Sequence, residues 1–223
     1  MNLSLINPYI RLAMKSRISA GHNIARRVIY DYELIYLEEG SFTFVYNDKG
    51  ECIAKHRKTH LFDINVPGGQ YFMESDTFTA GKDVTTFGTP WGKMGLIICY
   101  DIRFPELSRL LSLEGVNAIF VPAAFNMTTG PAHWEMSFRM RALDNQVFMV
   151  GCAPARDMES SYTAWGHSIA TDPWGFVIDQ MDETEGILTV ELDMSRLDTV
   201  RQQLPLLKHR RTDFYTVETI NKE

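Results

Sequence analysis

The amino-acid sequence predicts an α/β fold, and three observations lead to this prediction. The 223-residue chain alternates apolar runs typical of buried strands with stretches in which apolar side chains recur at helical spacing. An apolar run at residues 94–98, a helix that begins at Pro105 and a second apolar run at residues 118–121 form a βαβ unit. After residue 168, short strands separated by turns predict an antiparallel meander. Helices and strands that alternate before a meander are typical of the α/β class.

The N-terminal quarter of the chain predicts β-structure. In residues 29–37, large apolar and aromatic side chains alternate with acidic ones, which predicts one strand with a solvent-facing side. Residues 41–46 and 52–57 flank the sequence NDKG, a turn composition that predicts a hairpin. Lys58 follows the second strand directly, where a lysine is usually a surface charge, but the residues His60, Leu61 and Phe62 that follow it favour an inward direction.

Cys99 lies at a predicted strand-to-helix elbow in the sequence KMGLIICYDIRFPE. The preceding apolar run predicts a strand, and Pro105 is typical of the first turn of a helix. An elbow of this kind exposes the thiol, leaves the backbone N–H of Tyr100 facing an oxyanion and favours a thiolate at the helix N-terminus. The geometry suits a nucleophile. The alternative is that Cys99 is a small buried hydrophobic residue, as most free cysteines are.

The remaining elements follow the same patterns. The helix from Pro105 is expected to end near Gly115, and a second helix is expected to begin at Pro131. Further strands and a last helix are predicted at residues 147–152, 168–171, 176–179, 187–192 and 195–203.

Composition and charge exclude several classes of protein. A hydrophobic content of 45% argues against disorder, and a net charge of -6 argues against nucleic acid as the main partner. No apolar stretch is long enough to cross a bilayer, and the N-terminus lacks a signal-peptide pattern, so no membrane partner is expected. Cys52, Cys99 and Cys152 have no metal-type spacing, and an odd number suits a reducing compartment. The sequence therefore predicts a cytoplasmic location.

Several motifs in order resemble those of the nitrilase superfamily of carbon–nitrogen hydrolases. ICYDIRFPEL is similar to the cysteine motif of that superfamily, and RKTHLFD is similar to its lysine motif. The other matching stretches are AAFNMTTGPAHWE, RALDNQVFMVGCAPARD, YTAWGHSIATDPWG and RQQLPLLKHRRTDFY. The sequences of these motifs most resemble those of the omega-amidase branch, whose members deamidate small dicarboxylic acid monoamides.

The resemblance implies a fold and an activity. The fold is a nitrilase-like αββα sandwich, here incomplete at the N-terminus, that forms a homodimer through a helical layer. The activity is hydrolysis of small linear amides to acid and ammonia through a cysteine thioester, with no metal or organic cofactor. The alternative is a catalytically impaired or inactive nitrilase-fold fusion that acts as a small-molecule binding module.

The resemblance also implies roles for individual residues. Cys99 matches the nucleophile, and Lys58 matches the lysine that stabilises the oxyanion together with the Tyr100 N–H. Glu135, in PAHWE, matches a second family glutamate and is expected to orient Lys58 or the attacking water. The substrate pocket is expected to include Phe125 and Asn126, and a cation for a substrate carboxylate is expected from Arg103 or Arg156.

Other residues near the motifs have a structural interpretation. His133 and His167 permit a cysteine–histidine pair, but hydrogen bonds that hold loops are the preferred interpretation. Asp101 and Arg103 flank the elbow and are expected to form an internal ion pair.

The first forty residues do not resemble a nitrilase. They are similar to the start of a cupin-type sensor domain of arabinose-regulator-like transcription factors, so the predicted organisation is a cupin-like segment at 1–40 and a hydrolase domain at 41–223. The general-base glutamate of the family is not found there. Three glutamates of this segment are expected to face solvent rather than to replace that base: Glu33, Glu38 and Glu39.

Overall fold

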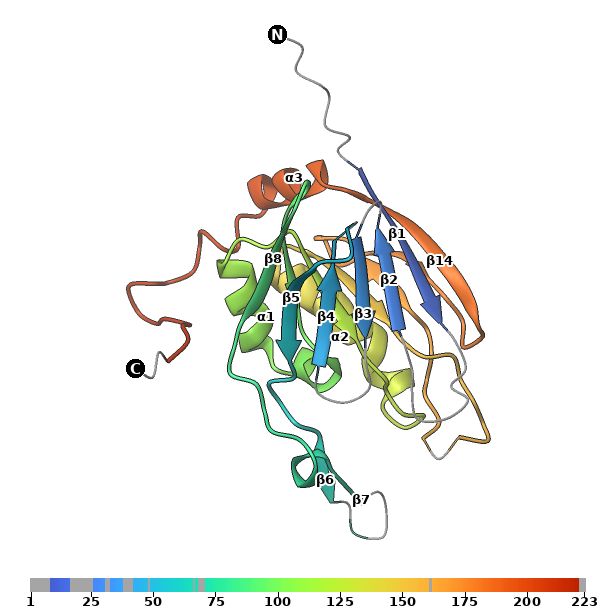
Figure 1. Cartoon of the computed structure of the whole chain (residues 1–223). Coiled ribbons are helices and arrows are strands. Elements are labelled where there is room, and N and C mark those ends of the chain that lie inside the picture. Colours follow the sequence, from blue (N-terminus) through green and yellow to red (C-terminus); the bar gives the residue numbers. More distant parts are fainter. Residues whose placement is uncertain are drawn as a thin grey trace.

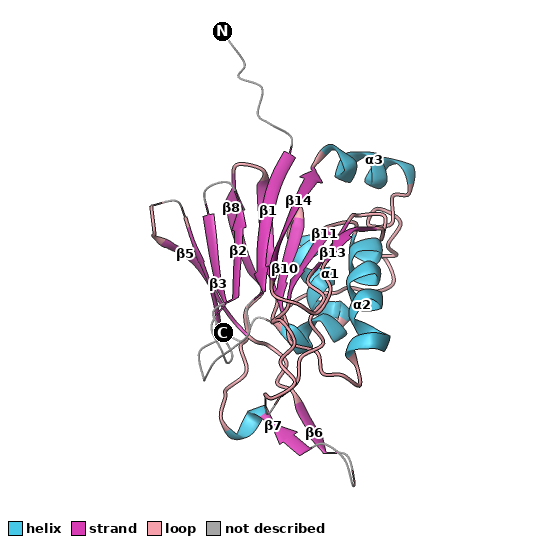
Figure 2. Ribbon diagram, turned by 90° about the vertical axis from the view of Figure 1, so that its right-hand side faces the viewer, coloured by secondary structure: helices cyan, strands magenta, loops and turns pink. Residues whose placement is uncertain are grey.

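The structure is a computed structural model that describes residues 9–16, 26–30, 33–37, 42–47, 49–65, 67, 71–160 and 162–220. Of the strands before residue 41, the backbone alone is described. Two six-stranded sheets form the centre of the molecule, and helices cover one of them (Figures 1 and 2).

The first sheet is antiparallel throughout and has the order β14-β1-β2-β3-β4-β5 (Figure 1). Its strands are β1 (Tyr9–Ser16), β2 (Arg26–Tyr30), β3 (Glu33–Leu37), β4 (Phe42–Tyr46), β5 (Cys52–Arg57) and β14 (Gly186–Asp193). The hairpin predicted at residues 41–57 is β4 and β5. Gly50 in its turn has a φ of +78°, a conformation that suits a residue without a Cβ.

Two expectations about this sheet were wrong. Residues 29–37 form not one strand but the end of β2 and all of β3, which pair with each other. Period-2 alternation continues across a two-residue connection, so the pattern does not reveal the reversal. Strand β14 was expected to belong to the antiparallel meander after residue 168. It pairs instead with β1 in the first sheet, from Tyr9↔Asp193 to Ser16↔Gly186. Its alternating burial fits a half-exposed strand in either sheet.

The second sheet has the order β13-β12-β11-β10-β9-β8. Strands β9, β10 and β11 are parallel, and their neighbours are antiparallel. Helix α1 (Pro105–Leu113) connects β9 to β10, and helix α2 (Gly130–Asn145) connects β10 to β11, so the predicted βαβ unit is confirmed. The bounds of the strands are β8 (Thr85–Thr89), β9 (Gly92–Leu96), β10 (Ala118–Pro122), β11 (Phe148–Cys152), β12 (Ile169–Thr171) and β13 (Val177–Gln180).

The second sheet is buried on both faces. One face packs on the first sheet through a cluster that includes Val45, Leu96 and Phe120. The other face packs on α1 and α2 through a cluster that includes Trp134 and Phe138. Every residue of β10 and β11 is therefore buried. Figure 2 shows the three layers, helices, sheet and sheet, which correspond to an αββα sandwich that lacks its second helical layer in the part of the chain described.

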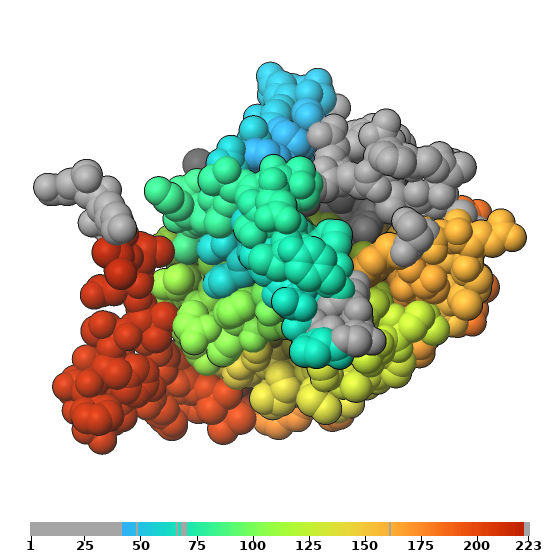
Figure 3. Space-filling view, turned by 90° about the horizontal axis from the view of Figure 1, so that it is seen from below, coloured from blue at the N-terminus to red at the C-terminus, as the bar shows by residue number. Residues whose placement is uncertain are grey.

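A short arm extends from one end of the two sheets (Figure 1). It consists of β6 (Asp63–Asn65), β7 (Tyr71–Met73) and the 3-10 helix η1 (Glu74–Asp76). Seen from below, the arm, in teal, lies beside the green segment that follows β9 (Figure 3). The ring of Phe62 at its base meets the ring of Tyr100 edge-on at 5.0 Å. The arm thus returns the chain to the carboxyl end of β9.

Helix α3 (Ser195–Gln203) has the predicted bounds. Its side chains Leu197 and Val200 are buried, and Arg201 donates hydrogen bonds to the carbonyl groups of Val116 and Gln146. Among the helices that the structure describes, none has the length and apolar character needed to cross a bilayer.

Candidate active site

Cys99 lies at the turn that the sequence predicted, directly after the buried residues Ile97 and Ile98 that follow β9. It opens a 3-10 helix, η2 (Cys99–Arg103), which separates the strand from α1, an addition that the sequence did not predict. The φ of Cys99 is +47°, in the left-handed region that costs a residue with a Cβ about 1 kcal/mol or more. Its sulfur lies 3.7 Å from the carbonyl oxygen of Ala124 and is half-buried. The elbow therefore holds the thiol in one orientation.

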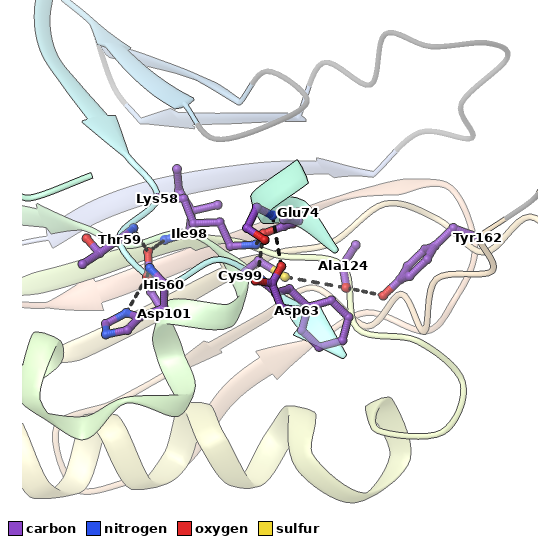
Figure 4. Close-up of polar contacts among 12 residues, drawn as sticks. Lys58, Thr59, His60, Asp63, Glu74, Ile98, Cys99, Asp101, Ala124 and Tyr162 are labelled. Atoms are coloured by element: carbon purple, nitrogen blue, oxygen red, sulfur yellow. Dashed lines mark hydrogen bonds and ion pairs between the residues drawn. The ribbon is translucent and has the colours of Figure 1, made fainter. Parts of the chain in front are cut away.

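Lys58 follows β5 and points inward, as expected, with its side chain only 3% exposed. Its Nζ lies 2.5 Å from Oε2 of Glu74, the first residue of η1. The same Glu74 oxygen accepts a hydrogen bond from the N–H of Phe62 at 2.7 Å. Figure 4 shows the Lys58 side chain reaching toward the Cys99 sulfur, with the Glu74 carboxylate beside its ammonium group. A thiol, a buried cation and a carboxylate therefore lie together.

Glu135 does not join this group. It lies on α2, pairs with Arg139 at 3.1 Å and is 49% exposed. Glu135 was expected to orient Lys58 or the attacking water; the carboxylate that contacts Lys58 is Glu74 of the arm, and the role of Glu135 toward water stays a prediction. Residues one helical turn apart on an exposed face form such pairs readily, and these contribute little to stability.

Tyr100 directly follows Cys99 in the chain. It is the second residue of η2. The first backbone N–H groups of a helix have no hydrogen-bond acceptor within the helix. Its ring packs edge-on against Phe104 at 5.2 Å, which holds the backbone on the far side of the elbow in place.

Asp101 is a buried carboxylate two residues after Cys99, and its partners are not those expected. The predicted ion pair with Arg103 is wrong: Asp101 contacts His60 Nδ1 at 2.9 Å and His56 Nε2 at 3.5 Å. Burial alone would raise the pKa of the Asp101 carboxyl. The hydrogen bonds from these two histidines and from the backbone N–H groups of Ile98 and His60 outweigh burial and lower the pKa to about 2.

Arg103 instead faces the loop before α2. Its Nη1 lies 2.9 Å from His133 Nδ1, and its guanidinium lies 4.6 Å from the ring centre of Phe125. Phe125 is buried and packs edge-on against Trp134. Arg103 therefore lies over Phe125. The preceding residue, Ala124, provides the carbonyl oxygen that contacts the Cys99 sulfur.

Arg156 and Asn126 are engaged by neighbouring loops. Arg156 donates a hydrogen bond to the carbonyl of Trp165 at 2.9 Å and lies 3.5 Å from Glu183. Oδ1 of Asn126 accepts three hydrogen bonds, from the N–H groups of residues 128 and 129 and from the hydroxyl of Thr129. Asn126 therefore shapes the loop that leads into α2.

The two histidines considered for a cysteine–histidine pair hold loops. His133 contacts Arg103, as described above. His167 Nδ1 lies 2.8 Å from the carbonyl oxygen of Trp165, and the two rings stack at 4.3 Å. Glu38 and Glu39 lie outside the described residues, as does the side chain of Glu33.

Metal binding has no obvious location here. Within the ranges that the structure describes, no group of three or more histidine, cysteine or acidic side chains is placed to hold a metal ion.

Comparison with known proteins agrees with this geometry. The model of the carbon-nitrogen hydrolase family matches residues 27–202. The chain belongs to the carbon-nitrogen hydrolase family. The match begins within the segment that the sequence analysis set apart as residues 1–40, whose strands β1 to β3 share a sheet with β4 and β5.

The curated relatives within this family include omega-amidases. Omega-amidase NIT2 of Mus musculus is 50% identical over 175 residues, which are 78% of this chain and 63% of that protein. Omega-amidase NIT2 of Homo sapiens is 47% identical over 174 residues, with the same coverage of both chains. The chain therefore spans a little less than two thirds of the length of these relatives.

Solved structures of family members share the fold. Nit3 of Saccharomyces cerevisiae, a member of branch 10 of the nitrilase superfamily, superposes with a TM-score of 0.69 at 42% identity, covering 80% of this chain and 60% of that chain. The NitFhit protein of C. elegans gives a TM-score of 0.76 at 38% identity, covering 82% and 44% respectively.

Sequence reasoning missed Glu74 and the two histidines at Asp101. Glu74 lies sixteen positions after Lys58 in the chain, and its contact with Lys58 depends on how the arm folds back. His56 and His60 carried a usable signal, because alternate positions of a strand that continues into the Lys58 loop face the same side.

Proposed function

We propose that this chain hydrolyses the amide bond of small linear substrates, such as dicarboxylic acid monoamides, through a thioester on Cys99. The observation that carries the proposal is the pairing of buried Lys58 with Glu74 beside a thiol held at a left-handed elbow. The omega-amidase relatives support the substrate class.

In the first step, the Cys99 sulfur attacks the amide carbon and the carbonyl oxygen becomes an oxyanion. The ammonium of Lys58 and the N–H of Tyr100 stabilise that charge in a site shielded from water. The carbon–nitrogen bond then breaks, and ammonia leaves with the proton that the thiol has given up. The product is an acyl thioester on Cys99.

In the second step, water attacks the thioester carbon and the carbon–sulfur bond breaks. The carboxylic acid leaves, and the thiol regains its proton. Both steps need a group that accepts and returns a proton. We assign this role to Glu74, because within the described residues it is the carboxylate in contact with Lys58.

A substrate carboxylate needs a cation to bind it, and Arg103 fits this role better than Arg156. The Arg156 guanidinium already has the Glu183 carboxylate at 3.5 Å. Arg103 has His133 and aromatic faces as its neighbours and no carboxylate partner among the described residues. A guanidinium without an acidic partner is available for bidentate binding of a substrate carboxylate.

The test follows ammonia release from a dicarboxylic acid monoamide together with the intact mass of the purified chain, with Cys99→Ala as the control. Sustained ammonia release that requires Cys99 supports the proposal. One equivalent of ammonia with a persistent acyl adduct shows that deacylation fails, and removes Glu74 from its proposed role. Absence of both signals overturns the proposal in favour of a binding module.

The family fold also supports a homodimer through the helical layer. On the outer side of that layer, Met136 of α2 is 64% exposed, Met140 is 45% exposed and Leu113 at the end of α1 is 41% exposed. Apolar side chains grouped on one helical face are typical of protein interfaces. Light scattering should give twice the monomer mass, and Met136→Glu with Met140→Glu should reduce it to that of a monomer. A wild-type chain that remains a monomer contradicts this proposal.

We also propose a cytoplasmic location and small molecules, rather than nucleic acid or membrane, as partners. Cys52 and Cys99 are free thiols, and Cys52 is exposed, which suits a reducing compartment. The net charge of -6 disfavours binding to polyanions. Fractionation of the source cells would test the location directly.

A further inference from the structure

A single buried carboxylate joins the two chain segments that carry the proposed catalytic groups. Asp101 lies on η2, two residues after Cys99, and its side chain is fully buried. Its oxygens accept hydrogen bonds from the elbow on one side and from the loop after Lys58 on the other (Figure 4). The mechanism above does not use this group.

Toward the elbow, Asp101 closes a local loop around Cys99. Oδ2 accepts the N–H of Ile98 at 2.9 Å, and the N–H of Asp101 donates to the carbonyl of Ile98 at 3.0 Å. These two bonds bracket the left-handed residue. A strained backbone conformation persists only where surrounding contacts fix it, and these contacts supply that restraint.

Toward the lysine, Asp101 fixes the two residues that follow Lys58. Its oxygens accept the N–H of Thr59 at 3.4 Å, the N–H of His60 at 2.7 Å and the side chain of His60 at 2.9 Å. The position of the Lys58 backbone relative to the Cys99 backbone is therefore set through one carboxylate.

The hydrogen bond to Asp101 defines the proton position on His60. An ionised carboxylate only accepts, so His60 Nδ1 carries the hydrogen that it donates to Asp101. His56 Nε2 faces the other oxygen at 3.5 Å without a well-formed hydrogen bond, and His56 Nδ1 shares a hydrogen bond with the hydroxyl of Thr85 at 2.9 Å. The His60 ring also stacks on Phe104 at 3.7 Å, which anchors it to the residue before α1.

We propose that Asp101 is a positioning residue that holds Lys58 in register with Cys99, and that His60 is the side chain through which it grips the lysine loop. The proposal rests on the proposed function for its effect on turnover, but not for its effect on the reactivity of Cys99. We call the hydrogen bonds from Thr59 and His60 to Asp101 the Asp101 clamp. When the clamp is removed, Lys58 and Glu74 move away from the Cys99 sulfur while the core of the protein remains folded.

The test compares His60→Ala, His60→Asn and Asp101→Asn. The Asn side-chain amide occupies nearly the position of histidine Nδ1 and donates the same hydrogen bond, so His60→Asn is the conservative variant. His209→Ala removes an exposed histidine from the C-terminal segment and is the matched control. Each variant is first shown to be folded at the assay temperature by a melting transition that lies above it, because Asp101→Asn is expected to melt earlier than the wild type.

The first readout is alkylation by iodoacetamide, followed peptide by peptide. Exposed Cys52 in the same molecule is the internal reference. Because a displacement of about 1 Å in a catalytic group costs up to about a hundredfold, we expect the Cys99-to-Cys52 rate ratio to fall at least about tenfold in His60→Ala and Asp101→Asn. In His60→Asn the ratio should return to within about threefold of wild type, because the hydrogen bond to Asp101 is restored. In His209→Ala the ratio should stay unchanged, because that hydrogen bond is not altered.

The second readout is turnover. We expect kcat to fall in His60→Ala and Asp101→Asn, to recover in His60→Asn and to stay unchanged in His209→Ala. KM should change by less than about twofold in each variant, because the clamp does not touch substrate. A wild type that is alkylated at Cys99 but releases no ammonia contradicts the proposed function and leaves the alkylation test of the clamp intact. An unchanged rate ratio in folded His60→Ala and Asp101→Asn overturns the clamp. Failure of His60→Asn to restore the ratio also overturns it, because packing against Phe104 would then explain the effect.

Discussion

Lys58 and Glu74 form a nearly buried ion pair at 2.5 Å, with side chains 3% and 17% exposed. The pair joins the end of β5 to the arm that returns from β7, so the charge next to Cys99 depends on two segments outside the parallel strands. Removing one partner of such a pair leaves the other charge buried and uncompensated, which is costly.

We therefore expect Glu74→Gln to reduce turnover strongly. Glutamine still accepts the hydrogen bond from the Phe62 N–H, but it neither neutralises Lys58 nor accepts a proton, and loss of a general base typically costs on the order of a hundredfold or more. Steady-state ammonia release measures the effect. Glu135→Gln is the matched control, because its partner Arg139 is on an exposed helix face, and its kcat should stay within about twofold of wild type. A larger loss at Glu135 than at Glu74 would contradict the assignment.

Arg103→Leu should weaken the binding of substrates that carry a carboxylate. A charge-assisted hydrogen bond contributes about 1.5–3 kcal/mol, so KM for a dicarboxylic acid monoamide should rise by about tenfold to a hundredfold. An uncharged monoamide of similar length is the control substrate, and its KM should change little. The corresponding variant Arg156→Leu should raise KM for both substrates or destabilise the fold, since Arg156 contacts the Glu183 carboxylate and the Trp165 carbonyl. Equal losses for charged and uncharged substrates with Arg103→Leu would remove it from this role.

Sequence patterns predicted the parts of the site that depend on local structure. The position of Cys99 follows from an apolar strand, a turn and a proline within one short stretch, and the inward direction of Lys58 follows from the residues after it together with the resemblance of RKTHLFD to the family's lysine motif. The helix α3 was predicted with its observed bounds, and it ends two residues before Pro205, which cannot continue a helix. These features need no knowledge of tertiary contacts.

Features that depend on distant contacts were not predictable in this way. The partner of Lys58 is decided by an arm that folds back, and the partner of β14 is a strand near the other end of the chain. Asp101 and Arg103 are two residues apart and opposite in charge, yet their backbone turn sends them to different neighbours. Charge and spacing alone therefore favoured an ion pair that does not form.

The low pKa of Asp101 predicts a loss of stability in acid. Its pKa is about 2 in the folded chain and 3.8 in an ordinary environment, so the ionised form stabilises the fold by about 2 kcal/mol at neutral pH. Because the folded value is the lower one, this contribution is complete above pH 3.8 and disappears as the pH falls toward 2. Urea unfolding of wild type and Asp101→Asn from pH 6 to pH 3 should show a difference in unfolding free energy that narrows in acid. A difference that is constant with pH would show that the charge is not the source of the stabilisation.

Gly151 in β11 lies against Phe138 of α2, and this contact predicts a packing defect. A Cβ on Gly151 would lie 2.3 Å from Cζ and 2.6 Å from Cε1 of a phenylalanine ring that is fully buried. Gly151→Ala should therefore reduce the unfolding free energy by about 1–3 kcal/mol, because the ring must leave its rotamer or push α2 outward. Denaturant unfolding measures the loss.

The partner variant distinguishes this clash from a general effect on the strand. Phe138→Leu removes the ring atoms that the new Cβ would meet, so the double variant should be more stable than the sum of the two single losses implies, by at least about 0.5 kcal/mol. Gly88→Ala is a suitable control in the same sheet, since nothing lies within 4 Å of a Cβ built there. Additive losses in the double variant would show that the helix and the strand separate instead, because then the ring and the new methyl group no longer share the same space.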